Sequence, residues 1–332
     1  MYPYPQLNRP EWIYTKKKMT EDSKVHEWIQ TLDNDRNEHL QQLLKKADVV
    51  LAGAPLSKSS ISASFASETP NELRKLWKSF NPYNLDENVD LSSLKVIDLG
   101  DTKQAITDID YSHEQIKQMM ISMQTYHPHG IPIIMGGDHS ITAQLIKGYK
   151  QVHDTKTIGV LQFDTHFDLR DPSVIGPANG TPIRQLIEGG IVKGSNVHTI
   201  GLHGYFNAKS LKNYADVHEV NYTTLKQARE IGVRQTVSKA LDLLDQTVDM
   251  IYVTVDMDVL DSAFGPGAPA STPGGMRTDE LFEAVMEAGR HPKANAMDLV
   301  CIDYSKDVEK QTLKAAVHVM LDFMTGLKQR RS

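Results

Sequence analysis

The chain has 332 residues, of which 40% are hydrophobic and 23% charged, and a formal net charge of −6 at pH 7. This length and apolar content fit one large α/β domain or two smaller ones with a sizeable buried core. The acidic balance, with basic residues dispersed along the chain, excludes a nucleic-acid footprint, and no apolar run approaches the roughly 18 residues of a membrane span.

The expected compartment follows from the N-terminus and the cysteine content. The first 20 residues are polar and contain prolines, without the apolar core of a secretory signal peptide. The single cysteine, Cys301, rules out an intrachain disulfide framework and is typical of a reducing compartment. We therefore expect a cytoplasmic protein that acts on a small molecule and binds neither nucleic acid nor membrane.

In chain order, the pattern begins with a polar N-terminal extension over residues 1–46, which contains a helix around 27–46 and packs on the domain. Apolar, strand-like runs then alternate with segments of helical periodicity, which is typical of an α/β domain. The expected strands are 48–55, 94–99, 132–135, 157–163, 196–201, 217–220, 250–255 and 296–302. The expected helices are 113–125, 141–152, 182–188, 225–244, 278–288 and 307–327.

Most of the expected strands are continuous apolar runs rather than alternating ones, which indicates burial on both faces of a parallel sheet. No low-complexity linker or internal repeat divides the chain, so residues 47–330 are expected to form one domain. In open sheets of this kind, ligands bind beyond the carboxyl ends of the strands.

Three short polar runs stand at such strand ends: GGDHS at 136–140, DTHFD at 164–168 and DMD at 256–258. Residues i, i+2 and i+4 of a strand share a face. Side chains within the second and third runs are therefore expected to converge, and the first run adds an imidazole. Together the runs offer six nitrogen and oxygen ligands: His139, Asp164, His166, Asp168, Asp256 and Asp258.

The four aspartates of this set predict a cation, because gathering them without one costs several kcal/mol per buried ion, roughly. Two divalent ions would leave a near-neutral site that can accept a bridging hydroxide, as in two-metal hydrolases with metals about 3.5–4 Å apart. The absence of thiolate ligands disfavours a structural zinc site and favours Mn²⁺ first, with other first-row metals possible. The plainer alternative is that the aspartates cap the loops after their strands.

These runs, extended to DMDVLDSAFGPG at 256–267, resemble in order and spacing the three signatures of the ureohydrolases, which comprise arginase, agmatinase, guanidino-acid hydrolases and formimidoylglutamase. The resemblance spans about residues 47–325. It implies a three-layer α/β/α sandwich with a central, mostly parallel eight-stranded sheet, a homo-oligomer and two Mn²⁺ per chain. It assigns one ion to His139, Asp164, Asp168 and Asp256, and the other to Asp164, His166, Asp256 and Asp258, with Asp164 and Asp256 bridging.

Within the family, residues 2–5, 54–62 and 179–184 look most like Gram-positive formimidoylglutamases. The implied reaction is hydrolysis of N-formimino-L-glutamate to L-glutamate and formamide, in histidine degradation. A hydroxide would attack the sp² carbon, with Asp168 orienting it and accepting its proton and His166 as the second catalytic residue. The alternatives are an agmatinase-like hydrolase of guanidino compounds that releases urea, and a metal-binding homologue of weak or lost activity.

Two positions depart from arginase-like chemistry. Asn179 stands where arginases and agmatinases have a histidine that shuttles protons, and asparagine cannot titrate. Cys301 stands where the family usually has a glutamate that pairs with the cationic end of the substrate. Three interpretations remain open. Cys301 could be a buried core residue, with activity diminished or lost. Asp303 or another acid could take over the cation, or a Cys301 thiolate could itself pair with the substrate. The substrate's carboxylates would need cations near the mouth, and the candidates there are Arg184, Arg170, Lys58 and His203.

Overall fold

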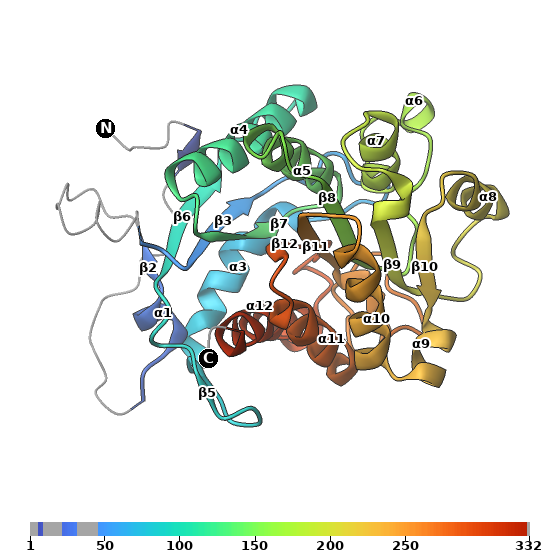
Figure 1. Ribbon diagram of the computed structural model, residues 1–332. Coiled ribbons are helices and arrows are strands. Elements are labelled where there is room, and N and C mark those ends of the chain that lie inside the picture. The colour runs from blue at the N-terminus through green and yellow to red at the C-terminus, as the bar shows by residue number, and fades with distance from the viewer. Residues whose placement is uncertain (1–5, 9–21, 32–45, 331–332) are drawn as a thin grey trace.

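The computed structural model describes residues 6–8, 22–31 and 46–330 (Figure 1). Its centre is a ten-stranded sheet in the order β1-β6-β3-β7-β12-β11-β8-β9-β10, with β2 also paired to β6. The strands are β1 Leu7–Asn8, β2 Gln30–Thr31, β3 Val49–Ala54, β6 Val96–Thr102, β7 Ile131–Gly136, β8 Ile158–Phe163, β9 Val197–Leu202, β10 Asn221–Thr224, β11 Met250–Asp256 and β12 Ala294–Val300.

The eight longer strands all pair in parallel, as the continuous apolar runs predict. Two short strands from the N-terminal region extend this parallel core by pairing with β6: β1 antiparallel and β2 parallel. A separate hairpin is formed by β4, Tyr83–Asn84, and β5, Val89–Asp90. The predicted fold class is confirmed.

Helices cover both faces of the sheet, which gives three layers (Figure 1). One buried cluster packs α4, α5 and α7 on one face, and a second packs α3, α9, α10, α11 and α12 on the other. The helices are α1 Val25–Trp28, α3 Thr69–Leu76, α4 Ile109–Tyr126, α5 Ser140–Val152, α6 Pro172–Ile175, α7 Pro182–Glu188, α8 Lys209–Val217, α9 Leu225–Ile231, α10 Val233–Asp245, α11 Thr278–Arg290 and α12 Gln311–Gln329. Of the described helices, none combines the length and the apolar character needed to cross a bilayer.

Three expected elements differ in the structure. The strand expected at 217–220 is wrong, because Val217 ends α8 and the turn through Glu219, at φ +58°, delays β10 to Asn221. The helix expected at 225–244 is two helices, because Gly232, at φ +96°, breaks it. Of the residues described in the N-terminal extension, Val25–Trp28 is helical, and Leu7–Asn8 and Gln30–Thr31 are strands. The helix expected around 27–46 falls mostly on residues 32–45, which lie outside the described part.

The strand order decides where the polar runs meet. Strands β7, β12, β11 and β8 are consecutive neighbours, although β11 and β12 come last in the sequence. Parallel strands end at the same edge of a sheet, so the segments that follow these four strands lie side by side. Three of the four carry the polar runs found in the sequence.

Candidate metal centre

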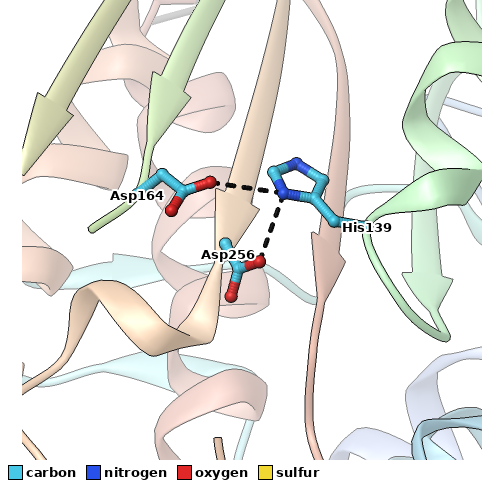
Figure 2. A group of neighbouring side chains, drawn as sticks. All are labelled: His139, Asp164 and Asp256. Carbon is cyan, nitrogen blue, oxygen red and sulfur yellow. Dashed lines mark ion pairs between the residues drawn. The ribbon is translucent and has the colours of Figure 1, made fainter. Parts of the chain in front are cut away.

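The centre is built around His139, the residue that precedes the first turn of α5. Figure 2 shows the carboxylates of Asp164 and Asp256 directed at its ring. The His139 Nδ1 atom lies 3.3 Å from Asp164 Oδ2, 3.2 Å from Asp256 Oδ2 and 2.7 Å from Asp168 Oδ2. All four side chains are buried, so this is one tight group of three carboxylates around one imidazole nitrogen.

A second group lies next to the first and shares Asp164 with it. The His166 Nδ1 atom lies 3.4 Å from Asp164 Oδ1 and 3.1 Å from Asp258 Oδ2. The ligand atoms of His139, Asp164 and Asp256 lie within 4.8 Å of one another, and so do those of Asp164, His166 and Asp258. The structure thus brings all six predicted ligands together in two adjoining groups.

The route by which these side chains converge differs from the predicted one. Only Asp256 belongs to a strand, because β8 ends at Phe163 and Asp258 lies in a 3₁₀ turn, Met257–Val259. The convergence comes from tight turns: Asp164 Oδ1 accepts from the His166 backbone N–H at 2.6 Å, and Asp256 Oδ1 from that of Asp258 at 2.9 Å. Alternation along a strand, the reason given by the sequence argument, is wrong.

Two buried atoms in the first group have no hydrogen-bond partner among the described residues: His139 Nδ1 and Asp168 Oδ2. They lie 2.7 Å apart, but without the angles that a hydrogen bond needs. An unpaired buried polar atom costs about 1–3 kcal/mol. A metal ion accepts lone pairs from both atoms, so the donor set fits a divalent cation with nitrogen and oxygen ligands.

The carboxylates raise the pKa of both histidines. Burial alone lowers the pKa of His139, but the charge on Asp168 and contacts with Asp164 and Asp256 raise it well above its usual range. For His166 burial is likewise outweighed, by Asp258 and Asp164, and the pKa is raised to about 12. In the absence of a cation, each imidazole therefore carries the positive charge that the carboxylates require.

The pKa is raised for three of the four aspartates and lowered for Asp164. Burial, followed by repulsion from neighbouring carboxylates, raises the pKa of Asp168 to about 7 and that of Asp256 well above its usual range, and burial also raises the pKa of Asp258. Burial opposes ionisation of Asp164 too, but its contacts with both histidine rings lower its pKa. A divalent cation would displace the protons that this cluster holds.

The metal-site side chains are supported by polar residues inside the apolar strands. The Thr254 hydroxyl lies 2.9 Å from His139 Nε2 and donates to Asp298 Oδ1 at 2.6 Å. Gln162 Nε2 donates to Asp164 Oδ2 at 2.7 Å, and its Oε1 accepts from Thr199 at 2.8 Å. Gln162 and Thr254 lie outside the three polar runs. The signal for both in the sequence is a polar residue two positions before an aspartate, in a strand that is otherwise apolar.

A pocket opens over the two groups, with Asp168, Asp256, His166 and Asp258 at its base. Arg170 is the only lysine or arginine that lines it, and no carboxylate of the described residues pairs with its guanidinium. The remaining lining residues form the walls and the mouth: Ile61, Ser62, Asn179, Gly180, Phe206, Asn207, Leu211 and Ala270.

Asn179 lies in the pocket wall, where its side chain holds the neighbouring loop. Its Oδ1 accepts from the Ile61 backbone N–H at 2.9 Å and its Nδ2 donates to Ser60 Oγ at 3.4 Å. The Asn179 backbone N–H donates to Ser59 O at 3.0 Å. The amide is therefore committed to fixing the loop that carries Ile61 and Ser62.

Other predicted substrate residues do not line the pocket. Arg184 is engaged by two carboxylates, Asp171 at 2.9 Å and Glu188 at 2.7 Å. His203 instead contacts Thr272 Oγ1 at 2.9 Å and lines a separate hollow. Lys58, also a candidate, is exposed and absent from the pocket lining.

The β12 end brings Cys301 beside the metal groups but turns Asp303 away from the pocket. Asp303 is buried and accepts from the backbone N–H and the hydroxyl of Ser305, at 3.0 and 2.6 Å. Cys301 is buried at φ +65°, next to Asp256. Burial, together with the charges of Asp256 and Asp258, raises the pKa of the thiol well above its usual range. This environment disfavours a thiolate.

The chain is similar to known proteins over most of its length. The model of the arginase family matches residues 47–326. The chain is 41% identical over 276 residues to the formimidoylglutamase of Halalkalibacterium halodurans, which covers 83% of this chain and 86% of that protein. It is 39% identical to that of Bacillus subtilis over 278 residues, 84% of this chain and 86% of the relative.

The fold is also similar to those of solved structures of formimidoylglutamases. The crystal structure of formimidoylglutamase from Bacillus subtilis is similar at a TM-score of 0.86 with 35% identity, covering 98% of this chain and 97% of that one. Trypanosoma cruzi formiminoglutamase, solved with Mn²⁺, has a TM-score of 0.81 at 23% identity, covering 93% of this chain and 100% of that one, which supports the fold.

Proposed function

The chain belongs to the arginase family, and from this premise we propose that it is a formimidoylglutamase. It hydrolyses a C–N bond of a linear amidine: N-formimino-L-glutamate and water give L-glutamate and formamide. The observation that carries the proposal is the pair of adjoining histidine–aspartate groups at the base of a pocket. The same pocket is lined by Arg170, which pairs with no carboxylate of the described residues.

We propose that two Mn²⁺ ions occupy the centre. His139, Asp164, Asp168 and Asp256 would hold the first ion, and Asp164, His166 and Asp258 the second, with Asp256 as a further shared ligand as the family resemblance implies. The unpaired atoms of His139 and Asp168 support this assignment, as does the Mn²⁺ in the related Trypanosoma cruzi structure. Bound there, the ions would lower the pKa of water so that hydroxide is available near neutral pH.

The reaction adds the oxygen of water to the formimino carbon and breaks the bond from that carbon to the glutamate nitrogen. The leaving nitrogen takes a proton and becomes the amine of glutamate, while the carbon leaves as formamide. We assign proton transfer to Asp168, because its buried Oδ2 has no hydrogen-bond partner and its side chain lines the pocket. We assign the second catalytic role to His166, which lines the same pocket.

We assign recognition of the substrate's carboxylates to Arg170. A charge-assisted hydrogen bond between a guanidinium and a carboxylate contributes about 1.5–3 kcal/mol. Arg184, His203 and Asp303, which were candidates for binding substrate, have no part in this assignment because their side chains are engaged elsewhere. Asn179 shapes the wall, and Cys301 stays a neutral thiol beside the ligands.

A substrate panel tests the proposal. Purified chain loaded with Mn²⁺ is incubated with N-formimino-L-glutamate, agmatine or arginine, and formamide, glutamate and urea are measured. We expect formamide and glutamate in equal amounts from the first substrate alone. Urea from a guanidino substrate would favour an agmatinase-like enzyme, and no turnover of any substrate would favour a homologue of lost activity.

We also propose a single catalytic domain over residues 47–330, with residues 1–46 packed against it. The pairing of β1 and β2 with β6, and burial of Val25 and Ile29 in the core, support this division. The one cysteine, buried and unpaired, supports a cytoplasmic location. We further propose a homo-oligomer, as the family resemblance implies. Light scattering of the purified chain would test the oligomer, and a monomer would refute it.

A further inference from the structure

We propose that Asn207 is a positioning residue that fixes the backbone on both sides of His166. The inference rests on the proposed metal centre and concerns how this chain orients one of its ligands. Asn207 lies after β9, on a loop distant in sequence from His166, and its side chain lines the pocket.

The side-chain amide of Asn207 uses both of its ends on the ligand loop. Its Nδ2 donates to Thr165 O at 2.8 Å, and its Oδ1 accepts from the Phe167 backbone N–H at 3.0 Å. These two peptide groups bracket His166. A planar amide that bonds residues i−1 and i+1 limits the backbone rotation at residue i, so it sets the direction in which the His166 side chain leaves the chain.

The loop needs such a support because it has left the sheet. The last contact with the neighbouring strand is the Asp164 N–H, which donates to Ile200 O at 3.0 Å. Beyond Asp164 the peptide groups no longer lie in a parallel ladder. Asn207 therefore takes the place of a neighbouring strand for the C=O of Thr165 and the N–H of Phe167.

The two histidines of the centre are held in different ways. The ring of His139 is held from behind, by the Thr254 hydroxyl at Nε2. The ring of His166 contacts Asp164 and Asp258 through Nδ1, and in the described part of the chain no hydrogen bond reaches its Nε2. Metal-ligating histidines ordinarily have a partner on the second ring nitrogen, which fixes the ring. For His166, the two hydrogen bonds from Asn207 to the neighbouring peptide groups fix the orientation of the ring instead.

The loop that carries Asn207 is fixed by contacts of His203 and Phe206, which precede Asn207 in the chain. His203 Nδ1 donates to Gly201 O at 3.1 Å, and the Thr272 hydroxyl contacts His203 Nε2 at 2.9 Å. The ring of His203 packs edge to face against Phe206, with 5.6 Å between ring centroids. Tyr205 in this loop is exposed, but the packing of His203 against Phe206 keeps Phe206 and Asn207 in the pocket lining.

The test measures Mn²⁺ binding to the full-length chain and its Asn207→Ala variant, by metal content after gel filtration and by titration. We expect the ion held by His166 to bind about 10- to 100-fold more weakly and the ion held by His139 to be unchanged. Hydrogen exchange at the Phe167 amide should accelerate in the variant. Asn207→Gln, which keeps the amide but moves it by one carbon, should show the same selective loss.

The matched control is Asn221→Ala, which removes another side-chain amide that donates to the backbone, at Ser195 O. Asn221 begins β10, at the end of the strands away from the metal centre. It should bind both ions as the wild type does. Wild-type affinity for both ions in folded Asn207→Ala and Asn207→Gln, or equal loss of both ions, would overturn the role of Asn207. A wild-type chain that binds no Mn²⁺ would instead refute the proposed metal centre.

Discussion

Thr254 donates its hydroxyl proton to Asp298 Oδ1 across 2.6 Å. Ionised Asp298 can only accept, and its other oxygen accepts from Thr142 at 2.8 Å and Tyr252 at 3.0 Å. The Thr254 oxygen therefore has only a lone pair to offer His139 Nε2. When Nδ1 gives up its proton, this arrangement keeps the remaining imidazole proton on Nε2, so Nδ1 can bind a metal.

Replacement of Thr254 by valine should weaken the ion bound through His139 by about 10- to 100-fold, because the imidazole loses the partner that fixes its tautomer. Thr254→Ser should restore the affinity. Mn²⁺ titration measures both. Thr325→Val, which removes a buried hydroxyl bonded to Leu321 O in α12, is the matched control. Equal Mn²⁺ affinities of Thr254→Val and the wild type would show that the hydrogen-bond chain from Asp298 through Thr254 to His139 does not support metal binding.

The shared position of Asp164 predicts an asymmetry between two aspartate variants. Asp164→Asn should bind neither ion tightly, because Asp164 contacts both histidines, whereas Asp258→Asn should keep the ion at His139. Metal content of the dialysed proteins distinguishes zero, one and two ions per chain. Asp303→Asn, a buried carboxylate outside the pocket, should keep two. An Asp164→Asn chain that retains two ions would contradict the two-group arrangement.

Arg170→Ala should raise KM for N-formimino-L-glutamate about 10- to 100-fold and leave kcat within a few-fold. The expectation follows from losing about 1.5–3 kcal/mol of charge-assisted binding to a carboxylate far from the reacting carbon. Steady-state kinetics measures the split. Arg184→Ala should behave as the wild type, since its guanidinium pairs with Asp171 and Glu188. The opposite ranking of the two arginines would move recognition to Arg184.

Cys301→Ser should keep most of the activity, because both side chains are neutral and close in size and the thiol is not ionised in this environment. Cys301→Glu should lose activity, because it adds a larger, acidic side chain beside Asp256 and Asp258. Formamide release measures both variants. A gain of activity in Cys301→Glu from a nearly inactive wild type would indicate a decayed site instead.

His198 should make folding stability depend on pH. Burial lowers its pKa from 6.5 to about 4, so the unfolded chain takes up a proton before the folded chain does. Stability from this group is complete above pH 6.5 and is lost as pH falls towards 4. Between pH 7 and 5 the wild type should lose about 2 kcal/mol that His198→Gln does not lose. Urea unfolding of the wild type and of His198→Gln at pH 7 and pH 5 measures this difference. An equal change in the free energy of unfolding of the two chains would refute the prediction.

The sequence predicts the parallel sheet well, because continuous apolar runs such as β8 and β11 are possible only where both faces are buried. It does not predict the break at Gly232, since a glycine within a helical pattern is compatible with either one helix or two. The six ligands could be found because their runs follow apolar strands. Asn207 and Asp298 could not, because they act through contacts between segments distant in the sequence.

The insertion of β11 and β12 between β7 and β8 fixes the order in which the protein can be completed during synthesis. A ribosome-bound chain that ends before β11 has made His139 and Asp164, but it lacks the two strands that join their halves of the sheet. Its β7 and β8 then present unpaired edges, which invite association with other chains. Assembly of the proposed metal centre would consequently be a late event, because Asp256 and Asp258 arrive only with β11 and the turn after it.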